Sequence, residues 1–256
     1  MAGPSPERHP LPIPHDRERE IEEARAIQQA MLRLEPVRVA PFEVICKARP
    51  ADEVGGDFLD YFWMLDGKLA LFLGDVTGKG LPAALYAALA VGILRGLKKG
   101  GESPGAVLEL LNRRLLDRQV PGRYCAVQYA VFDPSSQELT VVNAGLLPHP
   151  LHVSASGCRL IEGGGFPCGL FKSATYEQST LRLDKGDRVF FSTDGLIEAE
   201  NTAGEEFGLD RLMELCCRHS QDSAHTFLDG AFEAVDRFSA GTRQHDDMTA
   251  VVLQFG

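Results

Sequence analysis

The chain has 256 residues, of which 44% are hydrophobic and 24% are charged, a balance typical of a folded globular protein rather than a disordered or fibrous one. Its 36 acidic and 26 basic residues give a formal net charge of −10, which excludes nucleic acid as an expected partner because the phosphate backbone would be repelled. No apolar run reaches the roughly 20 residues of a membrane-spanning helix, so we expect no membrane partner and a cytoplasmic location.

The first 15 residues contain five prolines and no periodic pattern, which predicts a flexible leader. A helix is predicted over residues 16–35, because Asp16 can cap its start and Pro36 ends it. We interpret this segment as a regulatory or dimerisation helix, with packing on the chain's own domain as the alternative. A single large domain then occupies residues 36–256. The narrow apolar stripe of the helix contains Ile21, Ala24, Ile27 or Gln28, Met31 and Leu34.

Short strands and two helices come next. Asp66 and Gly67 join two strand-like runs, and this dipeptide is a strong hairpin signal because both residues tolerate positive φ. A helix over residues 81–97 is apolar on nearly all sides, which indicates burial between layers. Ser103 and Pro104 begin another helix that runs to about residue 118. The strands before these helices are predicted over residues 37–49, 58–65 and 68–73.

After Gly122 the pattern changes to strands, followed by two helices and a closing strand. The helices are predicted near residues 209–218 and 224–238, and the closing strand over residues 248–255. Strands grouped with strands and helices grouped in pairs indicate an α+β fold built of layers rather than repeated βαβ units. The strands before the helices are predicted over residues 124–132, 138–143, 149–153, 158–161, 177–183 and 188–192.

Six cysteines are spread along the chain without a C-x-x-C pair, and several lie inside apolar runs. Cysteines in such positions are most often buried and reduced. We therefore expect free thiols rather than disulfides or a zinc site at Cys46, Cys125, Cys158, Cys168, Cys216 and Cys217.

Four aspartates interrupt the apolar pattern at strand ends, where a buried carboxylate is costly unless something neutralises it. Glycines accompany most of them and let the backbone turn sharply beside a ligand. Any one of these aspartates alone would most often mark an ordinary turn. Together they fit hard divalent cations that prefer oxygen ligands, namely Mg²⁺ or Mn²⁺. The four are Asp57, Asp75, Asp194 and Asp246.

Five motifs stand in order around these aspartates: E-V-G-G-D-F at 53–58, G-D-V-T-G-K-G at 74–80, N-A-G at 143–145, T-D-G-L-I-E-A at 193–199 and D-D-M-T at 246–249. This set resembles the metal-dependent protein phosphatases, and more narrowly the bacterial SpoIIE-like, RsbU-like branch of the protein phosphatase 2C (PP2C) superfamily that regulates sigma factors. The resemblance runs from about Ile27 to the C-terminus. It implies a four-layer α-β-β-α sandwich of two antiparallel sheets flanked by paired helices.

The resemblance also implies a reaction and a substrate. Two Mn²⁺ or Mg²⁺ ions, with room in the family for a third, would activate water to hydrolyse phosphoserine or phosphothreonine on a partner protein. The partner implied by this branch is a phosphorylated anti-sigma-factor antagonist. No phosphoenzyme is expected, because the chain has no cysteine-phosphatase loop.

By resemblance, Asp75 is expected to bridge both ions, with the backbone carbonyl of Val76 on one of them. Asp194 and Asp246 would complete the other ion's ligands, and Asp57 would act mainly through bound water. Asp247 and Gly195 would support these ligands rather than bind the ions directly. Asparagine is common in the family at the position of Asp247.

The chain departs from the family pattern at two positions. Thr77 stands where many relatives have a histidine that protonates the leaving alkoxide, so the general acid remains open and water is one candidate. Leu146 follows N-A-G where this branch usually has histidine. His149 is interpreted as a surface residue rather than a replacement, and His245 as a residue that orients the D-D turn.

Other functions stay open beside the phosphatase. Lys79 could be mistaken for a P-loop lysine, but the four-residue spacer and the Ser/Thr after lysine are missing. The glycines at 163–165 predict a flexible loop near the site rather than a dinucleotide cradle. The alternatives are a phosphatase-like regulatory binding protein without turnover, and a phosphoesterase for small molecules, because metal ligands do not define the leaving group.

Overall fold

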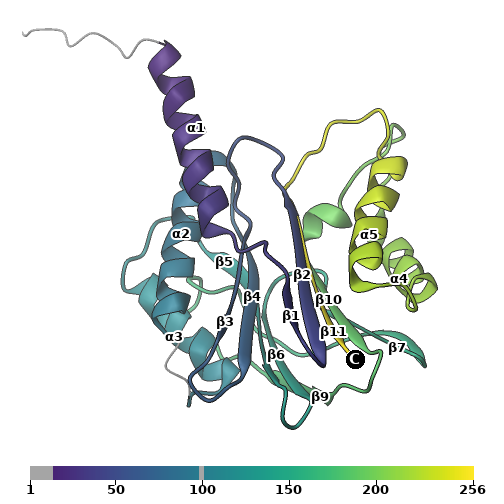
Figure 1. The fold of residues 1–256 in the computed structure, drawn as a ribbon. Helices are drawn as coiled ribbons and strands as arrows, with labels where there is room; N and C mark the ends of the chain where they lie inside the picture. The colour runs from purple at the N-terminus through teal and green to yellow at the C-terminus, as the bar shows by residue number, and fades with distance from the viewer. Residues whose placement is uncertain (1–13, 98–100) are drawn as a thin grey trace, which may run out of the picture.

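Two antiparallel sheets lie face to face between two pairs of helices in the computed structural model, which describes residues 14–97 and 101–256 (Figure 1). One helix pair covers the five-stranded sheet and the other covers the six-stranded sheet. The predicted α+β sandwich of four layers is confirmed. The first pair is α2 (Gly80–Gly96) and α3 (Pro104–Leu116), and the second is α4 (Gly208–Arg218) and α5 (Ala224–Phe238).

Every pair of neighbouring strands is antiparallel. The six-stranded sheet has the order β1 (Val37–Val39), β2 (Phe42–Arg49), β11 (Met248–Phe255), β10 (Arg188–Ser192), β7 (Leu151–Ser154) and β8 (Gly157–Leu160). The five-stranded sheet has the order β3 (Phe58–Trp63), β4 (Leu69–Val76), β5 (Cys125–Asp133), β6 (Glu138–Ala144) and β9 (Gln178–Arg182).

Strands β4 and β11 are apolar at nearly every position because both of their faces are buried. Leu71 of β4 packs between the two sheets, whereas Phe72 packs toward α2 and α3. Val251 of β11 packs between the sheets, and Val252 packs toward α4 and α5. Successive side chains point to opposite faces of a strand, so a slip of one residue would exchange these two cores.

Helix α1 (Pro14–Met31) ends earlier than the predicted limit at residue 35. The Arg95 guanidinium donates a hydrogen bond of 2.9 Å from Nη2 to the Met31 carbonyl, which occupies the helix C-terminus. Residues 1–13 of the predicted leader lie outside the described residues, and α1 already includes the last two positions of that leader. The helix projects from the body of the sandwich along much of its length (Figure 1).

The structure decides between Ile27 and Gln28, which the sequence leaves open: Ile27 is 72% exposed, and Gln28 is the residue buried beneath the helix. Two expectations from the sequence need correction. The segment 37–49 is not one strand but a hairpin, with Ala40 and Pro41 between β1 and β2. Helix α2 is not buried between layers, because its Leu85 is 65% exposed on the outer surface. No helix of the described ranges combines the length and apolarity needed to cross a membrane.

The expectation of reduced cysteines is wrong for one pair. The structure joins Cys158 of β8 to Cys217 of α4 in a disulfide, which the spacing of the two residues in the sequence does not indicate. The other four cysteines are free thiols, as expected. Burial raises the pKa of Cys168 to about 12, which keeps that thiol protonated and unreactive. The remaining free thiols are Cys46, Cys125 and Cys216.

Candidate metal centre

The four predicted metal aspartates lie at one end of the sandwich, and both sheets contribute to them. Asp57 directly precedes β3 and Asp75 is the second-last residue of the antiparallel neighbour β4, so these two come from the five-stranded sheet. Asp194 begins a short 3₁₀ turn, η1 (Asp194–Leu196), just after β10, and Asp246 precedes β11 in the six-stranded sheet. The carboxylates thus gather where the open ends of the two sheets meet.

A threonine ties the two sheets together at this end. The buried hydroxyl of Thr193 donates a hydrogen bond of 2.9 Å to Asp57 Oδ2 across the gap between the sheets. The same hydroxyl oxygen accepts a hydrogen bond of 3.0 Å from the backbone N–H of Thr249 on β11. Thr193, which follows β10, therefore holds Asp57 from the opposite sheet and is itself held by Thr249 of β11. The sequence places Thr193 at the start of the T-D-G-L-I-E-A motif but does not indicate this contact.

Two glycines allow the loops of the site to approach each other. A Cβ atom at Gly56 would lie 2.8 Å from the Val76 carbonyl oxygen and 2.9 Å from Asp75 Oδ1. A Cβ atom at Gly195 would lie 1.9 Å from the Asp247 carbonyl oxygen. Real Cβ atoms do not approach oxygen so closely, so only glycine fits at either position. The predicted supporting position Gly195 thus has a steric reason.

The aspartates raise one another's pKa values. Burial first, and the charge of Asp75 second, hold the pKa of Asp57 well above its ordinary range. Burial, followed by the charges of Asp194 and Asp246, raises the pKa of Asp75 to about 8. Burial and Asp246 also raise the pKa of Asp194, against which the nearby Lys79 acts only as the last contribution. The end of the sandwich is therefore an acidic pocket that is short of positive charge.

Asp247 lies close to this group, because its charge contributes to the raised pKa values of Asp57 and Asp75, and its carboxylate holds a backbone loop. Its Oδ1 accepts a hydrogen bond of 2.8 Å from the N–H of Ala51, and its Oδ2 accepts one of 3.4 Å from the N–H of Asp57. Its own N–H donates to Asp246 Oδ1 at 2.8 Å. Because both carboxylate oxygens serve the segment 51–57, the geometry fits the supporting role expected for Asp247.

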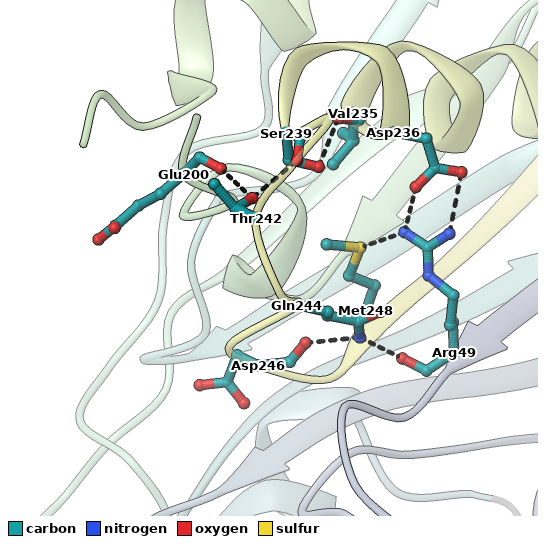
Figure 2. Close-up of polar contacts among 9 residues, drawn as sticks. All are labelled: Arg49, Glu200, Val235, Asp236, Ser239, Thr242, Gln244, Asp246 and Met248. Carbon is teal, nitrogen blue, oxygen red and sulfur yellow. Dashed lines mark hydrogen bonds and ion pairs between the residues drawn. The ribbon is translucent and has the colours of Figure 1, made fainter. Parts of the chain in front are cut away.

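Gln244 fixes the loop that carries Asp246 (Figure 2). Its side-chain amide donates to the Asp246 carbonyl at 2.7 Å and to the Arg49 carbonyl at 2.9 Å, which joins the loop to the end of β2. Lys79 holds the same loop from the other side, because its ammonium donates to the His245 carbonyl at 2.6 Å and lies 3.7 Å from Asp246 Oδ2. His245 thus contributes its backbone oxygen to the turn. Gln244 could not be predicted from the sequence, since its partners are backbone carbonyls that no motif reveals.

The two positions that depart from the family pattern are occupied in other ways. The Thr77 hydroxyl lies 3.3 Å from the carbonyls of both Gly122 and Tyr124 and is engaged by the backbone. Leu146 is buried in the core between the sheets. His149 is in contact with Asn143, whose amide nitrogen lies 3.2 Å from His149 Nδ1. In the part of the chain that the structure describes, none of these three side chains forms a hydrogen bond with one of the aspartates.

The donor set suits a hard divalent cation. Carboxylate oxygens that repel one another in a half-buried pocket are the groups that Mg²⁺ or Mn²⁺ would neutralise. Within residues 14–97 and 101–256, no three His, Cys, Asp or Glu side chains converge closely enough to enclose an ion by themselves. The fit therefore rests on the chemistry and charge of the aspartates.

The family description "Stage II sporulation protein E (SpoIIE)" matches residues 65–256, which is most of the chain. The chain belongs to the SpoIIE family. The matched range includes Asp75, Asp194 and Asp246, whereas Asp57 precedes it. The matched range includes both helix pairs and the strands from β4 onward, whereas β1, β2 and β3 precede it.

Curated relatives of this SpoIIE-family chain extend the similarity to its N-terminal part. Protein IcfG of Synechocystis is 27% identical over 263 residues, which cover 91% of this chain and 41% of IcfG. Phosphoserine phosphatase RsbU of Bacillus subtilis is 26% identical over 240 residues, which cover 92% of this chain and 70% of RsbU. The chain therefore spans less than half the length of IcfG.

Among solved structures, the SiaA-PP2C domain of Pseudomonas aeruginosa superimposes on this SpoIIE-family chain with a TM-score of 0.81. The match covers 94% of this chain and 97% of that domain at 19% sequence identity. This likeness shows that the two share the PP2C fold.

Proposed function

We propose that the chain is a metal-dependent phosphatase that removes phosphate from phosphoserine or phosphothreonine on a partner protein. The observation that carries the proposal is the acidic pocket to which both sheets contribute and in which burial and mutual repulsion raise the pKa of Asp75 to about 8. Two Mn²⁺ or Mg²⁺ ions in this pocket would supply Lewis-acid activation of water and would neutralise the phosphoryl charge.

Each aspartate has a distinct part in this proposal. Asp75 would bridge the two ions, with the Val76 carbonyl on one of them, and Asp194 and Asp246 would hold the other. Asp57 keeps its hydrogen bond from Thr193 and would act through water. The carbonyl of Val76 is available beside Asp75 because Gly56 leaves space next to it.

The leaving group would take its proton from solvent. A phosphoserine alkoxide needs a proton as the P–O bond breaks, and a histidine supplies it in many relatives. Here Thr77 is engaged by backbone carbonyls and His149 by Asn143. We therefore assign the role of general acid to water rather than to a side chain of this chain.

The proposed substrate is a phosphorylated anti-sigma-factor antagonist. Its support is family membership together with similarity to RsbU, which is named a phosphoserine phosphatase. A substrate of this class would place the reaction in the cytoplasm, where transcription factors act. Comparison of the phosphoproteomes of deletion and wild-type cells tests the assignment, and unchanged phosphorylation of every antagonist-type protein would contradict it.

One assay separates the proposal from its two alternatives. The purified chain is given p-nitrophenyl phosphate and a phosphoserine protein, each with Mn²⁺ and with excess chelator. A protein phosphatase hydrolyses both substrates with Mn²⁺, a small-molecule phosphoesterase hydrolyses only the first, and a regulatory binding protein hydrolyses neither.

We further propose that α1 regulates this site, and does so as a dimer. The Gln28 side chain donates to the Gly55 carbonyl at 2.7 Å and accepts from the Gly55 N–H at 3.0 Å, two residues before Asp57. A movement of α1 would therefore move the loop that carries Asp57. On its outer side α1 exposes Ile27, which a second copy of the helix could cover.

A further inference from the structure

An aromatic patch stands exposed on the loop between β8 and β9. Phe166 is 61% exposed and Phe171 is 47% exposed, and their rings meet edge to face with centroids 4.9 Å apart. Leu170 beside them is 38% exposed. We call Phe166, Leu170 and Phe171 the aromatic patch. Large apolar groups that face water together are typical of surfaces that bind a partner.

The loop beneath the patch is held by many hydrogen bonds. The Gly165 N–H donates to the Asn143 carbonyl at 2.7 Å, and Cys168 exchanges two backbone hydrogen bonds of 2.8 and 3.0 Å with Cys125 of β5. The Asn112 side chain of α3 donates to the Phe171 carbonyl at 2.8 Å and accepts from the Gly169 N–H at 2.8 Å. The aromatic rings are therefore presented to solvent by a fixed backbone.

The patch lies at the same end of the sandwich as the aspartates. Val76 pairs with Cys125 on the neighbouring strand, and Cys125 pairs in turn with Cys168 of the loop. Two strand spacings amount to about 10 Å between Val76 and Cys168. Phe166 and Phe171 lie two and three residues from Cys168, so a protein bound at the pocket would pass over or beside them.

The charge around the patch differs from that of the whole chain. The loop contains Lys172 and no acidic residue between Glu162 and Glu177, and Arg123 lies two residues before Cys125, although the chain carries a net charge of −10. The Arg123 guanidinium donates to the Thr77 carbonyl, next to Asp75 and Val76. An apolar surface with a cationic border is complementary to a phosphorylated segment that also carries apolar side chains.

We propose that the aromatic patch docks apolar side chains of the protein substrate that lie about three to five residues from its phosphoserine. Three to five extended residues span roughly 10 to 17 Å, which is long enough to cross the roughly 10 Å between Val76 and Cys168 and reach the rings beside Cys168. The inference rests on the proposed function and adds to it a docking surface that selects phosphoprotein segments by apolar residues outside the reacting group.

Two synthetic phosphoserine peptides test this docking. They are identical except at the third to fifth positions on both sides of phosphoserine, where one has leucine and the other serine. With Mn²⁺, the intact chain should have a kcat/KM about tenfold higher for the leucine peptide, mainly through a lower KM. The double variant Phe166→Ser/Phe171→Ser should reduce this ratio to about one, whereas Phe166→Leu/Phe171→Leu should keep most of it.

Leu65→Ser is the matched control. Leu65 is 88% exposed in the β3–β4 hairpin, at the opposite end of the strands from Asp75, so its substitution removes an exposed apolar side chain far from the pocket. It should leave the peptide ratio unchanged. Circular dichroism melts of every variant report whether the fold is kept.

The outcomes separate the docking proposal from the function on which it rests. If the intact chain hydrolyses neither peptide with Mn²⁺, the proposed function fails and the docking proposal falls with it. If the intact chain hydrolyses both peptides equally, or if the serine double variant keeps the leucine preference, the function stands and the docking proposal alone is overturned. Loss of serine-peptide turnover in the double variant would likewise overturn it, because the rings would then serve the metal centre itself.

Discussion

Among single residues, the aspartates are expected to contribute unequally to catalysis, and substitution can measure the difference. Asp75→Asn should lower Mn²⁺-dependent kcat/KM by about a hundredfold or more, since it removes the proposed bridging charge, and Asp194→Asn and Asp246→Asn should act similarly. Asp247→Asn should lose about tenfold or less, because an asparagine Oδ1 can still accept from the Ala51 N–H. Initial rates with p-nitrophenyl phosphate measure this order, and full turnover by Asp75→Asn would contradict the two-ion proposal.

The raised pKa of Asp75 predicts how the metal-free protein responds to pH. Its pKa is about 8 in the folded chain and close to 3.8 when unfolded, so the folded state keeps a proton that the unfolded state loses. The contribution of Asp75 to the free energy of unfolding is therefore most favourable below about pH 4 and is lost as pH rises toward 8. In excess chelator the melting temperature should fall between pH 5 and 8, and Mn²⁺ should restore it at pH 8.

Asp75→Asn is the control for this pH effect, because asparagine does not titrate. In chelator this variant should show a flatter dependence of melting temperature on pH than the intact chain. The contrary result would be a melting temperature of the intact, metal-free chain that rises steadily from pH 5 to 8. It would show that ionisation of Asp75 does not destabilise the fold.

The sequence indicates the aspartates, but it does not indicate the contacts that hold them. Asp57, Asp75, Asp194 and Asp246 stand in ordered motifs that break an apolar pattern, which a single sequence displays. Thr193 and Gln244 act on partners 56 or more residues away or on backbone carbonyls. Such contacts depend on how the two sheets pack against each other. Neither the composition of the chain nor the spacing of its residues predicts which residues this packing brings together.

At the level of elements, the two hydrogen bonds between Gln28 of α1 and the backbone of Gly55 can be tested by substitution. Gln28→Ala would leave the Gly55 N–H and carbonyl without their partners, and we expect it to lower the free energy of unfolding by about 1 to 3 kcal/mol. Urea unfolding measures this loss, and hydrogen exchange should show faster exchange of the Gly55 amide. Gln29→Ala, on the exposed side of the same helix, should change stability by less than about 0.5 kcal/mol. Equal effects of the two variants would argue against the link.

Element ends were predictable where the signal is local. Ser103 caps α3 by accepting from the Ala106 N–H, and Asp66 with Gly67 forms the turn between β3 and β4, as the sequence predicts. The end of α1 was not predictable, because the Arg95 side chain that occupies it comes from a distant helix. The disulfide escaped prediction for the same reason, since the β8 and α4 cysteines are 59 residues apart.

For the whole molecule, the exposed face of α1 predicts self-association. Ile27 is 72% exposed, and burying such a side chain against a second chain would stabilise by about 1.5 to 3 kcal/mol. Light scattering should give the mass of a dimer for the intact chain, a monomer for Ile27→Asp and a dimer for Ile27→Leu, with weaker Mn²⁺-dependent turnover in the monomer. A shortened chain beginning at Pro36 should also be monomeric. If these variants match the intact chain in mass and in metal dependence, α1 is a packing element and does not regulate.

The six-stranded sheet cannot be completed until β11 has been synthesised, because β11 pairs with β2. Arg49 and Met248 are register partners, yet they are 199 residues apart in the chain. At 5 to 20 residues per second, a ribosome would need roughly 10 to 40 s to supply the second strand after the first. Throughout that interval β2 has its short hairpin with β1 but an open edge on its other side, where β11 will later pair. Edge-to-edge aggregation would begin among nascent chains during this interval, when the edge of β2 is open. Chaperone binding would therefore matter most before β11 is synthesised.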